Sequence, residues 1–147
     1  MISFKKSMLL AVGLAALAAC GQSSPPAATS TTAADQAAIK AVSIAWKSAY
    51  NAGDAAAVAA LYAEDAVLSA PGEPVVRGHA SISDYFVKKV AEFSTTGLTV
   101  EDAPMGDVLA SGDLAWQWQT YKITDKSGAV VDTGKLVTLL QRKNGSG

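Results

Sequence analysis

Few side chains in this chain of 147 residues are suited to acid–base or metal chemistry, and they lie apart in the sequence. The one histidine, His79, follows Gly78, where we expect a helix to start. A metal site needs several His, Cys, Asp or Glu ligands, so this composition predicts no metal and no other cofactor. We expect His79 to have a helix-start or surface role; the alternative is a general base whose ring turns into a cavity.

The carboxylates do not form an obvious catalytic pair. Glu64 and Asp65 are adjacent and precede an expected strand, so their side chains should diverge. Asp102 and Asp107 lie in an extended stretch, where water is the expected partner. No Gly-rich phosphate loop, nucleophile elbow or Ser-His-Asp set can be assembled. The sequence therefore leaves open whether the protein is an enzyme.

The one cysteine, Cys20, ends a segment with the layout of an export signal. Lys5 and Lys6 give a basic start, and an apolar run too short to span a bilayer leads to small residues. The stretch Leu17-Ala18-Ala19-Cys20 resembles the lipobox of bacterial lipoproteins. This resemblance implies cleavage after residue 19 and a diacylglycerol on the Cys20 thiol, with further acylation for stable anchoring. An ordinary signal peptide with a chance cysteine is the alternative.

We therefore divide the chain into a signal peptide at 1–19, a lipidated cysteine with a tether at 20–34, and one domain at 35–147. The tether is rich in Ser, Thr, Pro and Ala and is predicted to be disordered. Gly21 resembles the outer-membrane sorting pattern, so we expect a bacterial envelope protein that faces the periplasm. Without Lys5 and Lys6, 10 basic residues stand against 13 acidic ones, and the net charge near −3 predicts no nucleic-acid partner.

The residues from 35 to 97 show helical periodicity. One face of a first helix, ending near Asn51-Ala52-Gly53, carries Ile39, Val42, Trp46 and Tyr50. Asp54 is predicted to cap a short second helix, with an inward face of Val58, Leu61 and Tyr62. After a strand that Pro71-Gly72 closes, a third helix should follow Gly78.

After Gly97 the sequence changes to three alternating, β-branched stretches separated by glycine-containing turns. Helices followed by an antiparallel meander predict an α+β domain. In 114–121, Trp116 and Trp118 share one strand face, and Gln117, Gln119 and Tyr121 share the other. We expect the tryptophan face to contact the helices, and the glutamine face to meet water or a second subunit.

The segment YNAGDAAAVAALYAEDAVLSAPGEPVVRGHASISDYF, residues 50–86, resembles the nuclear-transport-factor-2-like superfamily, in its SnoaL-like and ketosteroid-isomerase-like branch. The resemblance continues in GDLAWQWQTY and GAVVDTGKLVTLLQRKNG and covers nearly all of 35–145. It implies a cone-shaped, curved antiparallel or mixed sheet of the cystatin-like roll type. Three N-terminal helices would pack on its concave face, around an apolar pocket. Fold alone licenses no activity.

Ketosteroid isomerases use an aspartate base and an oxyanion hole made by a tyrosine and a protonated aspartate. Aligned on this family, those three positions fall on Trp46, Ala70 and Leu139, none of which transfers a proton at neutral pH. Steroid isomerase activity is therefore not expected. The alignment also predicts the residues that line the pocket: Trp46, Tyr62, Ala70, Tyr85, Trp116, Trp118 and Leu139.

Relatives normally continue past an Asn-Gly turn with a last strand, whereas this sequence ends in RKNGSG. Asn144-Gly145 is a strong hairpin signal, so the last strand of the sheet is missing from the sequence. A truncated chain, a short form completed by a partner strand, and a degenerate product are the explanations. A missing strand would leave backbone groups unpaired in residues 135–142.

Three functions remain open for the domain. The first is binding of a small apolar molecule in the pocket, on a protein anchored to the bilayer through Cys20. The second is an isomerase, cyclase or hydrolase with a non-standard base such as His79. The third is a structural module that forms a homodimer through the outside of the sheet.

Overall fold

The computed structural model describes residues 31–143, and within them the side chains of all but residues 102–105. The predicted signal peptide, Cys20 and the Asn144-Gly145 turn lie outside this range. The described elements are α1 (Ala33–Ala52), α2 (Ala55–Ala59), β1 (Val67–Leu68), β2 (Val76–Arg77), α3 (His79–Thr96), β3 (Thr99–Ser111), β4 (Leu114–Thr124) and β5 (Val130–Gln141). The predicted α+β class and the order of three helices before the long strands are confirmed.

The first helix begins two residues before the predicted domain boundary at Asp35. Thr32 is its N-cap, and Thr32 and Asp35 form a capping box in which each side chain bonds the backbone N–H of the other. The helix ends at Gly53, whose positive φ of 79° suits glycine and whose N–H bonds the carbonyls of Ala49 and Tyr50. The predicted end of this helix is confirmed.

The other two helices start at the predicted positions, and α3 also ends at its predicted glycine. The Asp54 carboxylate accepts a hydrogen bond from the Ala57 N–H at 2.9 Å, which confirms it as the cap of α2. His79 is the first residue of α3, and Gly97, with a positive φ, ends that helix. Helix α2 is shorter than expected, so Leu61 and Tyr62 lie just beyond it.

The most deeply buried cluster lies among the helices. Val58 of α2 packs with Ile82, Phe86 and Val90 of α3, and all four side chains are buried. Partly buried side chains from all three helices, the β1–β2 hairpin and the segment before it surround this centre, among them Trp46, Tyr50, Tyr62, Leu68, Val76 and Tyr85. The helices thus build a core of their own.

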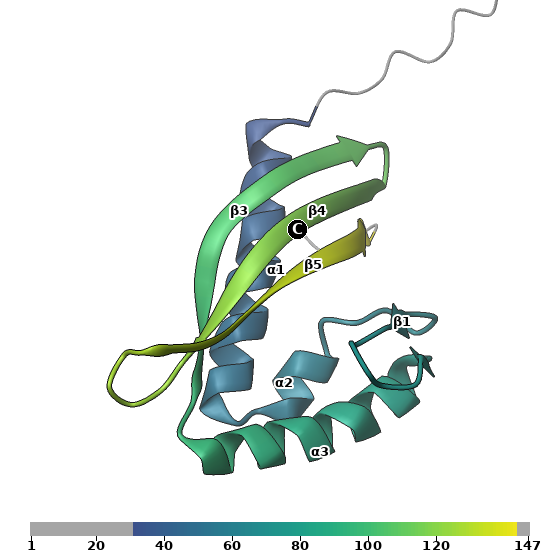
Figure 1. Ribbon diagram of the computed structural model, residues 1–147. Coiled ribbons are helices and arrows are strands. Elements are labelled where there is room, and N and C mark those ends of the chain that lie inside the picture. Colours follow the sequence, from purple (N-terminus) through teal and green to yellow (C-terminus); the bar gives the residue numbers. More distant parts are fainter. Residues whose placement is uncertain (1–30, 144–147) are drawn as a thin grey trace, which may run out of the picture.

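The described strands form two separate antiparallel sheets, a short β1–β2 pair and a three-stranded sheet in the order β3-β4-β5. Figure 1 shows the three long strands curving together, with α1 running along the sheet and α3 crossing near its lower end. In the larger sheet, Trp116 of β4 pairs with Leu109 of β3 and with Leu139 of β5. These three residues therefore share one face.

The expectation that the tryptophan face contacts the helices is wrong. Gln117 is 1% exposed, and its side-chain amide donates to the Ser43 hydroxyl of α1 at 2.9 Å. Because side chains alternate along a strand, Trp116 and Trp118 point away from α1. A buried glutamine is tolerated because the polar atoms of its side chain have hydrogen-bond partners. The Ser43 hydroxyl also donates to the side-chain oxygen of Gln117, and the side-chain oxygen of Gln119 accepts from the side-chain NH₂ of Gln117.

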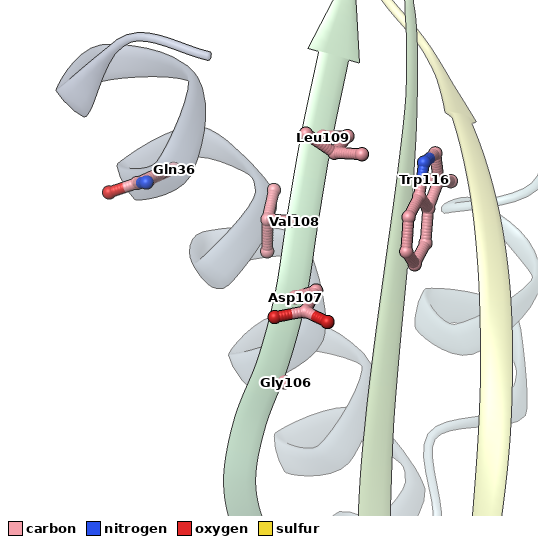
Figure 2. A pocket seen from close by; sticks show the side chains of 6 residues that line it. All are labelled: Gln36, Gly106, Asp107, Val108, Leu109 and Trp116. Atoms are coloured by element: carbon pink, nitrogen blue, oxygen red, sulfur yellow. The ribbon is translucent and has the colours of Figure 1, made fainter.

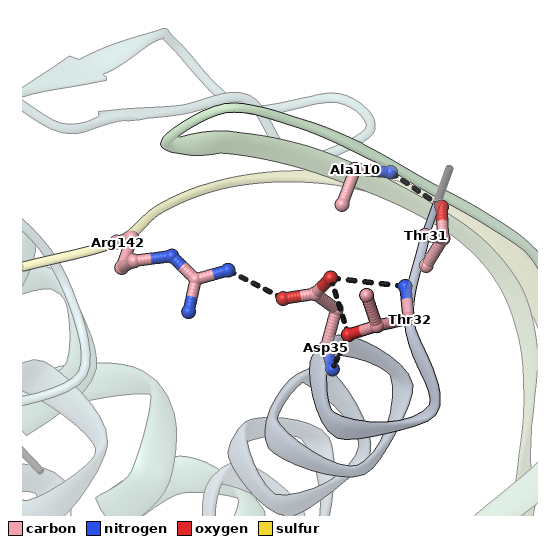
Figure 3. Close-up of polar contacts among 5 residues, drawn as sticks. All are labelled: Thr31, Thr32, Asp35, Ala110 and Arg142. Carbon is pink, nitrogen blue, oxygen red and sulfur yellow. Dashed lines mark hydrogen bonds and ion pairs between the residues drawn. The ribbon is translucent and has the colours of Figure 1, made fainter. Parts of the chain in front are cut away.

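The N-cap of α1 ties the helix to the end of β5 (Figure 3). Asp35 accepts hydrogen bonds from the backbone N–H and the hydroxyl of Thr32 and forms an ion pair with Arg142. The Thr32 backbone N–H, the Thr32 hydroxyl and the Arg142 guanidinium together lower the pKa of Asp35 from 3.8 to about 2. The ionised carboxylate therefore joins two segments 107 positions apart.

We predict that the melting temperature of the Asp35→Asn variant falls less between pH 4 and pH 2 than that of the unmodified chain. Because the folded-state pKa is below the unfolded value, the contribution of Asp35 is complete above about pH 4 and is lost as the pH falls toward 2. Thermal unfolding at pH 7 should occur at a lower temperature in Asp35→Asn, and the difference from the unmodified chain should shrink between pH 4 and pH 2. An equal difference at both pH values would contradict this role. Asp84→Asn, an exposed change on α3, is the control.

Candidate functional site

Four aromatic rings surround Phe86 of α3 and form what we call the helix aromatic cluster: Trp46, Tyr50, Tyr62 and Tyr85 with Phe86 itself. Trp46 and Tyr50 lie one turn apart on α1, so their rings stack at 4.8 Å. Tyr62 comes from the segment after α2, and its ring centre lies 5.3 Å from that of Phe86. Helical spacing and one short connection thus bring the rings together.

One polar contact lies inside this cluster. The Trp46 indole N–H donates to the Tyr62 hydroxyl oxygen at 3.2 Å. Burial raises the pKa of Tyr62 and also the pKa values of Tyr50 and Tyr85 above their ordinary value of 10.0. All three hydroxyls are therefore protonated at neutral pH, and the cluster presents neutral aromatic surface with hydroxyl groups that can donate.

Charged groups lie at the margin of the cluster. The Lys89 ammonium forms ion pairs with Glu73 at 2.6 Å and with Glu92 at 3.6 Å. The same ammonium lies 5.8 Å from the centre of the Tyr85 ring. The hydrogen bond to Glu73 is the main cause that raises the pKa of Lys89. Lys89 is thus held as a cation and is poorly suited to act as a base.

The residues that the sequence predicted to line one pocket lie in separate places in the structure. Trp46, Tyr62 and Tyr85 come together in the helix aromatic cluster. Ala70 lies in the turn between β1 and β2, where its carbonyl accepts from the Glu73 N–H at 3.2 Å. The other predicted residues, Trp116, Trp118 and Leu139, lie on the sheet face that points away from α1.

That second face carries six large apolar side chains, which we call the outer sheet face: Leu109, Leu114, Trp116, Trp118, Val137 and Leu139. Leu139 is 82% exposed and Trp118 is 37% exposed. Trp118 lies against Gly106 of β3, where an added Cβ would come within 2.3 Å of the indole. Leu139 therefore lies apart from Trp46 and Tyr62, on an exposed part of the sheet.

A depression of about 480 Å³ runs beside β3 (Figure 2). Its described lining is Gln36, Gly106, Asp107, Val108, Leu109 and Trp116. Asp107 is the one carboxylate there, and Gln36 and Val108 are lining residues that the sequence patterns did not indicate. A smaller space of about 130 Å³ lies near the Asp35–Arg142 ion pair. Among the described lining residues, the larger space has no second acid–base group beside Asp107, and the smaller one has Asp35 and Asp113, of which Asp35 is ion-paired with Arg142.

His79 takes the helix-start position that the sequence predicts, and its backbone N–H bonds the Glu64 carbonyl at 3.0 Å. Within residues 31–143, its ring has no hydrogen-bond partner that would orient it as a base. No cluster of metal-ligating side chains is found in the same residues. None of the helices in this part of the chain has the length and hydropathy that a bilayer crossing requires.

Solved structures with similar folds include a protein of unknown function with a cystatin-like fold from Nostoc punctiforme. It has a TM-score of 0.69 and 14% identity over 79% of this chain and 86% of that chain. An NTF2-like protein with a cystatin-like fold from Novosphingobium aromaticivorans has a TM-score of 0.64 and 18% identity, over 77% and 82%. A ketosteroid isomerase-like protein from Erwinia carotovora atroseptica is 27% identical, with a TM-score of 0.60, over 77% and 88%.

No curated protein matches this sequence. The sequence model of the SnoaL-like domain matches residues 44–146, which include all of α2, α3 and the strands. The matched range also contains the whole helix aromatic cluster and the whole outer sheet face. Together with the cystatin-like folds of the similar structures, this match shows that the chain belongs to the SnoaL-like domain family.

Proposed function

We propose that the protein binds a small, mainly apolar molecule against the helix aromatic cluster. The observation that carries this proposal is the contrast in burial within the cluster. Phe86 at its centre is 3% exposed, whereas the rings of Trp46, Tyr50, Tyr62 and Tyr85 around it are only partly buried. Partly covered aromatic rings that meet on one buried centre offer apolar surface to a ligand.

The polar groups of the cluster restrict the ligand further. The Tyr62 oxygen accepts from Trp46, so the Tyr62 hydroxyl proton remains available for an acceptor atom of the ligand. The tyrosines are neutral, and Lys89 at the margin is already paired with Glu73. The site therefore suits a neutral, flat molecule with one acceptor oxygen better than an anion or a cation.

The proposal is tested with a variant in which Trp46 is the one tryptophan, made by Trp116→Phe and Trp118→Phe. We predict that 2-acetylnaphthalene quenches Trp46 fluorescence and binds about fivefold more tightly than 2-ethylnaphthalene, which lacks the acceptor oxygen, since one hydrogen bond contributes about 1 kcal/mol. In Tyr62→Phe this preference should disappear while the protein remains folded by circular dichroism. Fluorescence titration measures both affinities.

Two results would count against this site. One is the absence of Trp46 quenching by either compound and by a wider set of neutral apolar molecules. The other is quenching that is seen only when Trp116 and Trp118 are present, which would place ligands on the outer sheet face instead. A matched change on that face, Leu139→Ala, should leave the Trp46 titration unchanged.

We further propose that the domain is exported and anchored to the bacterial outer membrane through Cys20. The support is the sequence alone: the basic start, the apolar run and the Leu17-Ala18-Ala19-Cys20 stretch. We predict that the protein extracted from its own membrane begins at an acylated Cys20 by intact mass. Cys20→Ser should yield protein without acyl mass that no longer sediments with membranes, and an acylated product of that variant would refute the assignment.

A second candidate function is a homodimeric interaction module, and the outer sheet face favours it. The sequence predicted that a dimer forms through the sheet face with Gln117, Gln119 and Tyr121. That face is turned toward α1, so the dimer interface that we propose is the opposite one, the outer sheet face. Large exposed apolar patches on a soluble domain often mark protein contacts, and stable dimers bury roughly 800 Å² on each partner. The side chains of the outer sheet face, five of them exposed and Trp116 partly buried, would form the centre of such an interface.

We predict that Leu139→Asp dissociates this dimer, because the change would bury an unpaired charge at its centre. Sedimentation velocity should show a dimer for the unmodified chain and a monomer for Leu139→Asp. Val87→Asp adds the same charge on the exposed surface of α3 and should leave the dimer intact. A monomer before any substitution would argue against the module, as would a dimer that tolerates Leu139→Asp.

A further inference from the structure

A bulge in β3 sets one carboxylate apart from the pairing of the strand. The register with β4 shifts between Met105 and Val108. The two residues between them, Gly106 and Asp107, lie opposite the single residue Trp118 of β4. Two residues against one define a β-bulge, and such bulges often re-aim a side chain beside a functional site. The exposed side chain of Asp107 is therefore placed by the bulge and not by regular alternation.

Asp107 lies beside an aromatic ring and apolar side chains. With Val108 and Leu109 of β3 and Trp116 of β4, it lines the depression of about 480 Å³ (Figure 2). Leu109 and Trp116 are cross-strand neighbours, and Gln36 of α1 adds a side-chain amide to the lining. Small-molecule pockets commonly enclose about 300–1,000 Å³. The depression therefore has the size of a ligand site, with one carboxylate beside an indole ring.

No Lys or Arg of the described chain forms an ion pair with Asp107. The ion pairs found there join Lys89 and Arg142 to other carboxylates. Residues 90–121 contain no Lys, Arg or His but five Asp or Glu residues, and the segment 20–34 contains no basic residue either. Lys40, one helical turn from Gln36, is exposed and is not among the lining residues. The depression thus carries a negative charge that a ligand can neutralise.

We propose that this depression binds a small organic cation that carries an alkylated ammonium group. The ammonium group would lie against the Trp116 ring, because the face of an indole attracts cations, with the Asp107 carboxylate as its counter-charge. Its alkyl groups would contact Leu109 and Val108, and the Gln36 amide would bond a hydroxyl of the ligand. The proposal does not depend on the helix aromatic cluster, so it stands apart from the ligand site proposed above.

The same groups argue against other classes of ligand. An anion would meet the Asp107 carboxylate without a compensating cation, and a neutral apolar molecule would take water from that charge without replacing it. A phosphocholine headgroup of a lipid carries the required ammonium group but adds a phosphate that Asp107 repels. We therefore assign the site to a free organic cation and not to a lipid headgroup.

The cation site shares Leu109 and Trp116 with the outer sheet face. A homodimer through that face would cover both residues, so cation binding and this dimer would compete. The helix aromatic cluster shares no residue with the described lining of the depression. Binding at the two ligand sites can therefore be followed separately, through the signal of Trp116 for the cation and that of Trp46 for the apolar ligand.

The test follows the indole N–H signals of the three tryptophans by NMR, in the 147-residue chain and a detergent without ammonium groups. Trp116→Phe assigns the Trp116 signal. Choline is the probe, and its control is neohexyl alcohol, the neutral analogue in which a carbon atom replaces the nitrogen. We predict that choline shifts the Trp116 signal and binds about fivefold more tightly than the control, through one cation–π contact and one partly screened ion pair. Phosphocholine should bind more weakly than choline.

Asp107→Asn supplies the matched variant, because the residue is exposed and its replacement should leave the fold intact. Choline should bind this variant about threefold more weakly, and the neutral control should bind as before. Asp113→Asn removes a carboxylate between β3 and β4, outside this depression, and should change neither affinity. The absence of a Trp116 shift with choline up to about 50 mM would overturn the proposal. Equal binding of choline and its control, unchanged choline affinity in Asp107→Asn, or tighter binding of phosphocholine would overturn it as well.

Discussion

The hydrogen bonds between Gln117 and Ser43 decide which face of the large sheet meets the first helix. Gln117 is almost completely buried, and a buried amide without partners would cost about 1–3 kcal/mol. Ser43 and Gln119 satisfy it, so the strand can turn its glutamine face inward. Once this face is fixed, alternation turns Trp116, Trp118 and Leu139 outward. The exposed apolar sheet and the separate core among the helices both follow from this one choice.

Much of the local structure could be predicted from the sequence. Asp54, Gly53 and Gly97 mark helix ends through capping and backbone geometry, which depend on neighbours within a few residues. The strand stretches were also predictable because β-branched alternation and glycine turns are local signals. The resemblance in residues 50–86 indicated the family that the match over 44–146 shows.

Local patterns of this kind could not predict which face of the large sheet contacts the first helix. Alternation along the strand places Gln117 and Trp118 on opposite faces but does not say which face packs against the helices. Polarity alone favours the tryptophan face for that position, because tryptophan is more apolar than glutamine. The deciding contact joins residues 74 positions apart, and no local pattern reports it. The same limit applies to the candidate site. Trp46, Tyr62 and Tyr85 meet around Phe86 within the helical part of the chain, whereas the places of Trp116, Trp118 and Leu139 depend on how the sheet is turned.

Two surfaces of the domain therefore have different chemistry. The helix aromatic cluster presents neutral rings and one available hydroxyl proton, which suits a small ligand better than acid–base catalysis. The outer sheet face presents apolar side chains that suit another protein surface. The ligand site proposed on the helix aromatic cluster and the proposed dimer interface thus use different residues of one small domain.

The orientation of Gln117 is the most direct test of this account, because the sheet faces depend on it. Nuclear Overhauser contacts of the Gln117 side-chain amide protons can be measured in labelled protein. The account predicts contacts to the Ser43 β-protons of α1, and slow exchange of these amide protons with solvent. Contacts from the Trp118 indole to α1, with rapidly exchanging Gln117 amide protons, would mean that the sheet faces the other way and would contradict it.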